Sequence, residues 1–335
     1  MNNPFDTPAF GLTQLTNAIN LVPNMYGKIG GLGIFADKPV STRNIAVEER
    51  NGILNLLQSK PIGSPGTVET NVKRKLRSFI IPHIPHDGAV EAEEVQGVRA
   101  FGSESTPQSV VGVMTDKLTS MRNKHAITLE YLRMGAVKGL ILDADGSTLY
   151  DLYSEFGVTQ KTIAMALATA TTEVVNKCQD ISGYLEDNLL GETMNGAVAL
   201  CSPEFFAKLV VQPNVKEAYK FAMSNEFLRQ DLRVPGFDFG GIKWVEYRGV
   251  ATDAAGNSRR FIAANEAHVV PLGTMDTFKT YYAPADFNET VNTLGQPIYA
   301  KQEPRKWNRG TDIHTQSNPL PMCHRPALLV KLTTN

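Results

Sequence analysis

The chain has 335 residues, a formal net charge of -1 and an apolar fraction of 42%. This length allows two modest domains or one elaborated domain with a packed core, and the near-neutral charge gives no sign of general binding to nucleic acid or acidic membranes. No apolar run reaches the ~18 residues of a membrane span and the N-terminus lacks a signal-peptide pattern, so we expect a soluble intracellular protein.

The first segment, residues 1–41, is predicted to be a loose N-terminal arm. Prolines and a glycine cluster interrupt it, and one short helix is predicted near Thr13–Leu21. The glycine-rich stretch Gly30–Phe35 has no clean strand before it and lacks the G-x-G-x-x-G spacing. A phosphate-binding loop is therefore not indicated there.

Residues 42–81 are predicted to form an extended β-ribbon. Thr42–Glu49 alternates between apolar and polar residues, Asn51-Gly52 is a strong hairpin signal, Pro61–Gly66 is a loop, and Thr67–Ile81 alternates again. The last strand would extend about 50 Å, far beyond the usual five or six residues. Because an isolated two-stranded ribbon is barely stable in water, we expect a neighbouring chain to hold it.

The ribbon carries a basic run, KRKLR, at Lys73–Arg77. A phosphate-binding patch is one interpretation, but the run has no interleaved aromatic residues and lies on a strand. A solvated or subunit-facing charged strand, which also discourages wrong edge pairing, is favoured.

A long amphipathic helix is predicted over Ser105–Leu140. At 1.5 Å per residue it would be about 50 Å long, whereas a compact chain of this size has a radius of gyration of roughly 20 Å. We therefore expect a flat or extended molecule; the alternative is a long surface helix of an ordinary enzyme. Its apolar stripe comprises Met114, Leu118, Met121, His125, Leu129, Leu132, Ala136 and Leu140. The off-stripe charges, expected to face solvent or neighbours, are Asp116, Arg122, Glu130 and Arg133.

The second half alternates between strands and helices. A hairpin closed by Ala144-Asp145-Gly146 comes first, and Thr159–Leu190 is predicted to be helical with a break near Ser182-Gly183. The remaining predicted elements are the strand Ala197–Cys201, the Ser202-capped helix to Val211, the helix Pro213–Arg229, the strands Phe237–Gly241 and Ile242–Arg248, the turn Asp253–Asn257, and the strands Arg260–Ala263 and Ala327–Leu332.

No catalytic constellation, metal site or cofactor site is predicted. His83 and His86 have H-x-x-H spacing, but the prolines between and around them preclude a helix, so we interpret both as loop histidines. His125 is expected to be a hydrogen-bonded core residue. Asp143, Asp145 and Gly146 resemble the start of a calcium loop, but the glycine stands two positions too early.

The other reactive residue types give no site either. The three cysteines, Cys178, Cys201 and Cys323, are typical of buried thiols in a reducing compartment. Glu91, Glu93 and Glu94 look solvated. None of the common nucleophile, nucleotide or zinc motifs is present, which favours a non-enzymatic protein.

The order of elements and the amino-acid sequence of the second half resemble the phage major capsid protein E family, the lambda-like branch of the HK97-fold shell proteins. The strings that carry this resemblance are CSPEFFAKLVVQPNVKEAYKF (Cys201–Phe221), FDFGGIKWVEYRG (Phe237–Gly249), FIAANEAHVVPLGTMDTFKTYYAPAD (Phe261–Asp286), NTLGQPIYAK (Asn292–Lys301) and QSNPLPMCHRPALLVKL (Gln316–Leu332). They consist of structural residues, so they identify a fold family and mark no site.

The resemblance implies an α+β HK97-like capsid fold. It divides the chain into an N-terminal arm (1–41), an extended β-hairpin loop (42–81), a peripheral domain (82–187) with a spine helix at about 105–140, an axial α/β domain (188–267) and a return to the peripheral domain with a C-terminal strand (268–335). The implied function is that of a major capsid protein of a tailed bacteriophage, which assembles as pentamers and hexamers into an icosahedral head shell around the genome.

The implied partners are further copies of the chain, a separate scaffold, a portal and a decoration protein. Packaged double-stranded DNA would be contacted non-specifically at most, and no membrane is involved. The implied location is the virion, after assembly in the host bacterial cytoplasm. Some relatives cross-link their shells through lysine and asparagine; Lys60, Lys73 and Lys75 lie in or near the loop, but no acceptor is evident, so no cross-link is predicted.

Two other functions remain as alternatives. A cellular nanocompartment shell of the same fold would package a cargo enzyme, which genome context or co-purifying cargo would reveal. An α/β enzyme with a spatially assembled site would show a deep pocket containing residues with strongly shifted pKa values.

Overall fold

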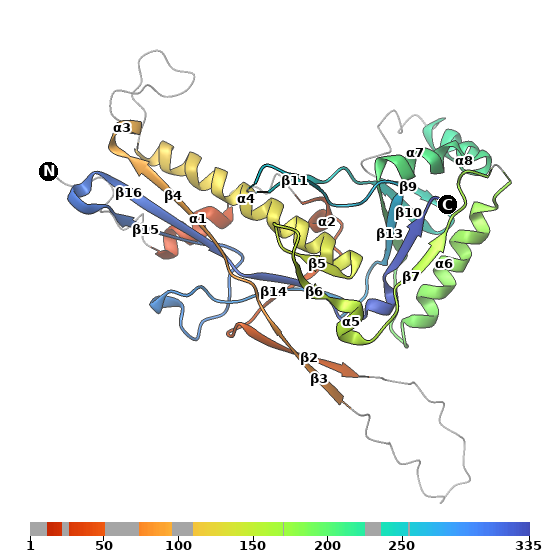
Figure 1. Cartoon of the computed structure of the whole chain (residues 1–335), viewed down its shortest axis with the longest axis horizontal. Coiled ribbons are helices and arrows are strands. Elements are labelled where there is room, and N and C mark those ends of the chain that lie inside the picture. Colours follow the sequence, from red (N-terminus) through yellow and green to blue (C-terminus); the bar gives the residue numbers. More distant parts are fainter. Residues whose placement is uncertain are drawn as a thin grey trace, which may run out of the picture. The chain divides into compact units, whose positions relative to one another are not determined.

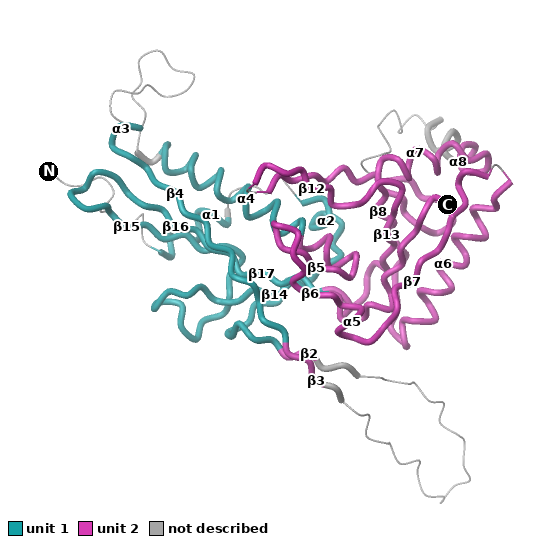
Figure 2. The backbone as a smooth tube through the Cα atoms, in the orientation of Figure 1, with its two compact units in different colours: residues 1–45, 79–131, 279–322 teal, residues 46–78, 132–278, 323–335 magenta. Residues whose placement is uncertain are grey.

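The computed structural model describes residues 12–21, 27–50, 74–95, 110–169, 171–224, 236–253 and 255–335. The chain divides into two compact units, each built from three separate segments (Figure 2). Unit 1 comprises residues 1–45, 79–131 and 279–322, and unit 2 comprises residues 46–78, 132–278 and 323–335. Both units combine helices and sheets, so the fold is of the α+β class (Figure 1).

Unit 1 is organised around a three-stranded antiparallel sheet. Its elements are α1 (Leu12–Leu21), α2 (Lys28–Gly31), β1 (Ala36–Pro39), β4 (Ile84–Glu91), α3 (Ala92–Val95), most of α4 (Val110–Lys138), β14 (Phe278–Tyr282), η3 (Asn288–Thr290), β15 (Tyr299–Pro304), the turn η4 (Lys306–Asn308), β16 (Gly310–Ser317) and β17 (Pro319–Cys323). The strands run in the order β15-β16-β4, with register from Gly310↔Glu91 to Ser317↔Ile84. Apolar residues of α1 and α4 form one core cluster with this sheet: Leu15, Ile19, Val90, Val113, Met114, Leu118, Met121, Ile298, Ala300 and Ile313.

A second sheet of unit 1 has the order β1-β14-β17, with β1 parallel to β14. The chain returns close beside it at Gly295, whose amide donates a hydrogen bond to the carbonyl of Val40 at 2.9 Å. A Cβ atom at Gly295 would overlap the backbone carbonyl of Tyr282. The absence of a side chain is therefore what permits this close approach of two backbone segments.

Replacing Gly295 by alanine is expected to lower the free energy of unfolding by about 1–3 kcal/mol, because the new methyl group must push two backbone segments apart. Urea unfolding of the unassembled subunit, followed by circular dichroism, measures this change. Gly31→Ala in the same unit is the matched control, since nothing lies within 4 Å of a Cβ there. Equal stabilities of the two variants would contradict the close approach.

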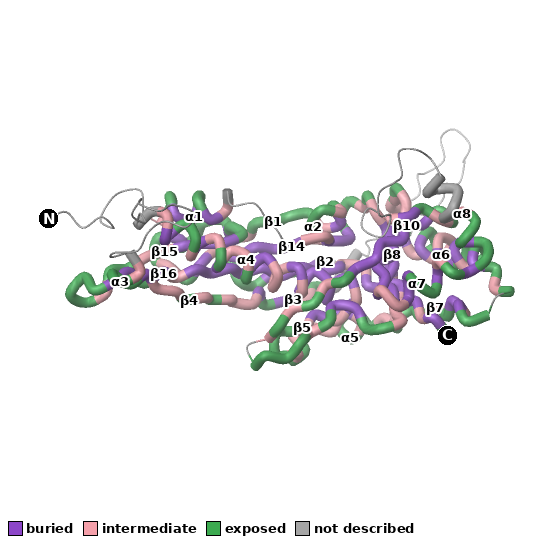
Figure 3. Tube along the Cα trace, turned by 90° about the horizontal axis from the view of Figure 1, so that it is seen from above, coloured by how far each residue is buried: buried purple, intermediate pink, exposed green. Residues whose placement is uncertain are grey.

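Unit 2 contains a six-stranded mixed sheet in the order β7-β18-β13-β8-β10-β9. Its elements are β5 (Leu140–Leu142), β6 (Thr148–Asp151), α5 (Leu152–Phe156), β7 (Lys161–Ala164), α6 (Val174–Asn188), β8 (Ala197–Cys201), α7 (Pro203–Val211), α8 (Pro213–Ser224), β9 (Phe237–Phe239), β10 (Ile242–Glu246), β11 (Val250–Thr252), β12 (Ser258–Arg260), β13 (Glu266–Pro271), η5 (Pro326–Leu328) and β18 (Val330–Thr333). Every residue of the central strand β8 is buried, as Figure 3 shows, which agrees with its uninterrupted apolar sequence.

The main core of unit 2 lies between this sheet and its helices. Side chains of α6, α7 and α8 pack against alternate residues of β8, β10, β13 and β18. The start of α7 is specified locally: Ser202 accepts a hydrogen bond from the amide of Phe205 at 3.3 Å, and Pro203 occupies the first turn. At the centre of the core, Trp244 stacks on Phe205 with ring centroids 6.2 Å apart.

The long helix is present, and its predicted start lies outside the described residues. α4 spans Val110–Lys138, and most of the predicted stripe is buried, including Met114, Leu118 and Leu132. The expectation that the off-stripe charges face solvent or neighbouring subunits is wrong for Glu130 and Arg133, which are buried within the chain. Glu130 accepts a hydrogen bond from the amide of Ile29 at 2.8 Å, which offsets part of the cost of burying its carboxylate.

The predicted helix Thr159–Leu190 is wrong in its first half. Lys161–Ala164 forms strand β7, which pairs in parallel with β18; a partner strand distant in the sequence outweighs the helical propensity of the alanines. The expected break at Ser182-Gly183 is also wrong, since α6 continues through both residues.

The remaining strand and turn predictions differ mainly at their ends. Strand β12 ends at Arg260, where a strand was predicted to begin. The 3₁₀ turn η5 (Pro326–Leu328) precedes β18, which is shorter than the predicted strand. The hairpin of β5 and β6 is confirmed. The two strands predicted around Gly240-Gly241 are present as β9 and β10 and pair with each other, and the predicted turn Asp253–Asn257 connects β11 and β12.

The described part of the ribbon consists of β2 (Asn44–Arg50) paired with β3 (Arg74–Ile80). The Asn51-Gly52 turn and the Pro61–Gly66 loop lie outside the described residues. One face of the pair is buried, with Val47 and Phe79 5% and 1% exposed. Leu76 and Ile80 alternate with Phe79 along β3 and are 67% and 61% exposed. The ribbon therefore presents two large apolar side chains to solvent.

Candidate functional site

The histidines singled out from the sequence have structural partners in unit 1. His83 precedes β4 and contacts Asn318 Oδ1 at 3.1 Å and Gln316 Nε2 at 2.9 Å. His86 lies on strand β4, so its predicted loop position is wrong. β4 is an edge strand that pairs with β16, and an edge strand tolerates the neighbouring Pro85. Within the described ranges, no group of three or more His, Cys, Asp or Glu residues could hold a metal ion.

His125 is a hydrogen-bonded core residue, as predicted. Its Nε2 lies 3.0 Å from Thr315 Oγ1, and its ring makes an edge contact with His86 at a centroid distance of 6.1 Å. Burial lowers the pKa of His125 to about 4, with further lowering from His86 and His314. The ring is therefore neutral at physiological pH and serves packing.

The glycine and aspartate motifs are used by local structure. Gly30 and Gly31 belong to the short helix α2. In the turn between β5 and β6, Asp143 accepts a hydrogen bond from the amide of Ala144, and Asp145 accepts one from the amide of Ser147. The turn interpretation of this stretch is confirmed.

The basic run lies partly in the described structure. Lys60 and Lys73 fall outside it, and Lys75 lies on β3. Arg77 stacks over the ring of Phe156 at 4.9 Å, so this cation packs against an aromatic side chain of unit 2.

The cysteines are buried, whereas two of the three glutamates Glu91, Glu93 and Glu94 are exposed. All three cysteines are free and buried, and burial raises the pKa of Cys178 and Cys323 to about 12. Glu91 and Glu93 are exposed, while Glu94 pairs with Lys117 at 3.1 Å. No helix among the described residues is long and apolar enough to cross a membrane.

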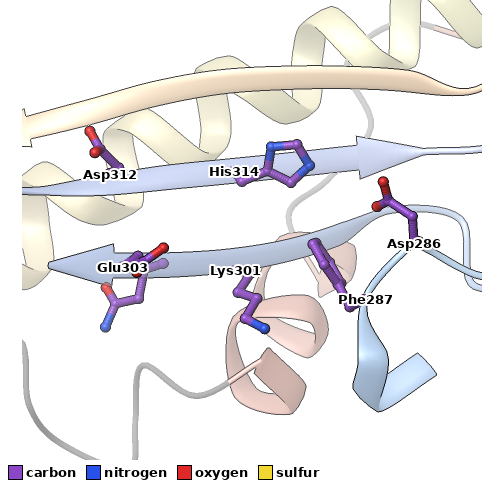
Figure 4. A pocket seen from close by; sticks show the side chains of 7 residues that line it. Asp286, Phe287, Lys301, Glu303, Asp312 and His314 are labelled. Atoms are coloured by element: carbon purple, nitrogen blue, oxygen red, sulfur yellow. The ribbon is translucent and has the colours of Figure 1, made fainter. Parts of the chain in front are cut away.

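A surface hollow of about 390 Å³ lies on unit 1, across strands β15 and β16 (Figure 4). β15 contributes Lys301 and Glu303, β16 contributes Asp312 and His314, and the loop after β14 contributes Asp286 and Phe287. Side chains on adjacent strands share a face at every second residue, which places these pairs together. The volume is that of a small binding pocket, about 300–1,000 Å³.

Several charges around the hollow are already paired. Lys301 Nζ lies 2.8 Å from Glu289 and 5.1 Å from the centre of the Phe287 ring. Asp312 pairs with Arg305 at 2.6 Å, and His314 pairs with Asp87 at 2.5 Å. In the described structure no cation pairs with Asp286 or Glu303. The hollow therefore carries excess negative charge beside an aromatic ring.

The hairpin between β15 and β16 ends in an exposed basic and aromatic tip, Arg305–Arg309. Trp307 is 87% exposed and has a φ of 66°, a backbone conformation that costs of order 1–3 kcal/mol for a bulky residue. Sequence analysis did not single out either the tip or the hollow. The only sequence signal was the run PRKWNRG, because the hollow's residues come from three segments that meet only in the fold.

Comparisons with known proteins agree with the resemblance in the sequence. The family described as phage major capsid protein E matches residues 11–334. The chain is 34% identical to the major capsid protein of Pseudomonas phage KPP10 over 338 residues, covering 96% of each. It is 28% identical to that of Salmonella phage Felix O1 over 351 residues, covering 96% of this chain and 95% of the relative.

The fold is also similar to solved structures. The capsid of Ralstonia phage GP4 aligns with a TM-score of 0.53 at 9% identity, covering 90% of this chain and 87% of that chain. At this identity the likeness concerns the fold alone, and it confirms the HK97-like α+β class.

Proposed function

Because the chain belongs to the phage major capsid protein E family, we propose that it is the repeating subunit of an icosahedral head shell, assembled as pentamers and hexamers. The observation that carries this proposal is the family match over residues 11–334, together with a relative of 34% identity over 96% of the chain. A family of this kind implies a structural and non-enzymatic role. The near-neutral net charge suits a shell, since it limits repulsion between many copies.

The exposed apolar side chains of the ribbon support assembly through that segment. Leu76 and Ile80 lie on one face of β3, while the opposite face is packed. A two-stranded ribbon gains its stability from a surface that covers its apolar residues, and a neighbouring subunit supplies such a surface in a shell.

We assign the chain to an arm (1–41), an extended loop (42–81), a peripheral domain with a spine helix (82–187), an axial domain (188–267) and a return segment (268–335). The axial segment lies entirely in unit 2, and residues 279–322 of the return segment lie in unit 1. Residues 132–187 also lie in unit 2, so the border between the peripheral and axial domains is the part of this assignment that a shell structure tests.

The proposed partners are further copies of the chain, a separate scaffold, a portal and a decoration protein. The shell encloses double-stranded DNA with non-specific contacts at most, and it assembles in the host bacterial cytoplasm before becoming part of the virion. No cross-link is assigned to Lys60, Lys73 or Lys75.

Negative-stain electron microscopy of the expressed protein tests this function. Capsomers or closed shells are the expected result, and a strictly monomeric protein under assembly conditions contradicts it. An enclosed cargo enzyme would instead favour a cellular compartment.

Deleting Ile62–Gly66 from the proposed extended loop is expected to impair assembly and leave the subunit folded, because the loop is assigned to contacts between subunits. Particle yield by sedimentation and circular dichroism of the soluble subunit measure the two effects. Global unfolding of the deletion variant would place the loop in the subunit's own core.

A further inference from the structure

The hairpin tip at Arg305–Arg309 carries charges that unit 1 leaves unpaired. Arg305 is held by Glu91 at 3.0 Å and by Asp312 at 2.6 Å. No ion pair is formed by Lys306 or Arg309 with the described residues, and both side chains are exposed. Trp307 lies between these two cations in the sequence, and its side chain is 87% exposed. An exposed tryptophan flanked by unpaired cations is typical of an interface anchor.

The hollow on the same hairpin has the complementary chemistry. Asp286 and Glu303 supply two carboxylates that no described cation neutralises, and Phe287 supplies an aromatic wall (Figure 4). The two unpaired carboxylates match the two unpaired cations of the tip in number and sign. The volume of about 390 Å³ admits a side chain as large as an indole.

The tip touches its own hollow only at the edge, where Arg305 pairs with Asp312 at 2.6 Å. Lys306 and Arg309 form no ion pair with Asp286 or Glu303 in the described part of the chain, although Lys306 follows Glu303 by only three positions. The unpaired charges of the two surfaces are therefore free to meet in a contact between separate molecules. It uses different surfaces on the two partners, and such a head-to-tail contact forms a ring when the rotation between successive copies closes.

We propose that the Arg305–Arg309 tip of one copy of this chain docks into the Asp286–Phe287–Glu303 hollow of a second copy. Trp307 enters the hollow beside Phe287, and Lys306 and Arg309 pair with Asp286 and Glu303. The inference rests on the proposed self-assembly and names one contact that assembly uses.

Exchanging the charges of one tip residue and one hollow residue tests the proposed pairing between copies. Every copy carries both surfaces, so both substitutions can be made in the same chain. Glu303→Lys alone and Lys306→Glu alone are each expected to raise the protein concentration needed for assembly by about tenfold, because each places like charges in the contact. The double variant Glu303→Lys with Lys306→Glu restores opposite charges in every tip–hollow contact and is expected to recover most of the assembly. Asp180→Lys, at an exposed carboxylate of α6, is the matched control and is expected to assemble like the parent chain.

Tryptophan fluorescence tests the docking of the indole. The chain has two tryptophans, and Trp244 is fully buried, so acrylamide quenching of free subunits reports mainly on Trp307. Quenching is expected to fall severalfold on assembly in the parent chain, and Trp307→Phe is expected to be weakly quenched in both states.

The outcomes separate this contact from assembly itself. Shells in which Trp307 remains as accessible as in free subunits overturn the contact and leave the proposed function intact. Single charge variants that assemble normally, or a double variant no better than the singles in spite of native circular dichroism, also overturn it. A parent chain that forms no particles at all contradicts the proposed function.

Discussion

Replacing Trp244 by alanine is expected to lower the free energy of unfolding by about 3–5 kcal/mol, the usual cost of removing a large buried aromatic side chain. Trp244 is fully buried at the centre of the unit 2 core, where it stacks on Phe205. Its Nε1 donates a hydrogen bond to the carbonyl of Phe239 at 3.0 Å. The substitution removes the stacking, leaves a cavity and deprives that carbonyl of its donor.

Urea unfolding of the unassembled subunit, followed by circular dichroism, measures this effect. Trp244→Phe is the informative control, because a phenyl ring retains much of the stacking on Phe205, removes the N–H donor and leaves a smaller cavity than alanine does. We expect this variant to lose about 1–3 kcal/mol, the cost of a buried acceptor without its partner. If the alanine variant lost no more than the phenylalanine variant, packing of the indole would not be what stabilises this core.

Local sequence patterns predicted the elements whose own residues decide their structure. The run Ala197–Cys201 is apolar throughout and forms a strand buried on both faces, and Ser202-Pro203 begins the next helix as its capping pattern indicates. The hairpin closed by Ala144-Asp145-Gly146 was found for the same reason. Such elements need no information from distant parts of the chain.

Predictions failed where distant segments decide the outcome. Lys161–Ala164 is a strand because β18, far along the chain, offers it a parallel partner. Glu130 and Arg133 lie off the apolar stripe of α4, yet the second half of this helix is buried on nearly all sides. Helical periodicity identifies one packed face, and it does not show how many faces tertiary structure covers.

The candidate contact surfaces were even less accessible to sequence analysis. The hollow joins Asp286, Glu303 and Asp312 from three segments, and no spacing rule connects them. Which charges are unpaired also depends on the fold, since Arg305 and Lys301 are taken up by neighbours while Lys306 is not. The family resemblance predicted the fold and the function. The hollow and the unpaired charges of the hairpin tip can be identified only in the three-dimensional structure.

Lowering the pH from 6.5 to 5.0 is expected to reduce the stability of the unassembled subunit by about 2 kcal/mol for each of two buried histidines, at about 1.4 kcal/mol per pH unit. The pKa of His125 is lowered to about 4, mainly by burial and also by His86 and His314. The pKa of His268 is lowered to about 3, mainly by burial and also by Lys138 and Lys331. Glu266 lies 3.9 Å from His268 Nε2. The lowering of the His268 pKa by burial outweighs any raising by this carboxylate.

The sign of this effect follows from which state binds the proton. An unfolded histidine is protonated as the pH falls through about 6.5, whereas these two stay neutral in the folded chain until about pH 4 and 3. Protons therefore bind preferentially to the unfolded chain in this window, so stability is complete above pH 6.5 and is lost towards pH 4. Urea unfolding at pH 7.0 and 5.0 measures the loss.

The variants His125→Gln and His268→Gln separate the two contributions, because glutamine does not titrate. His125 lies in unit 1 and His268 in unit 2, so each variant reports on a different unit. Each is expected to make the difference in stability between pH 7.0 and 5.0 about 2 kcal/mol smaller, whatever its stability at pH 7.0. Between pH 7.0 and 8.0 both histidines are neutral in both states, and this range serves as the internal control. An unchanged acid sensitivity in both variants would mean that the two rings are protonated as readily in the folded chain as in the unfolded one.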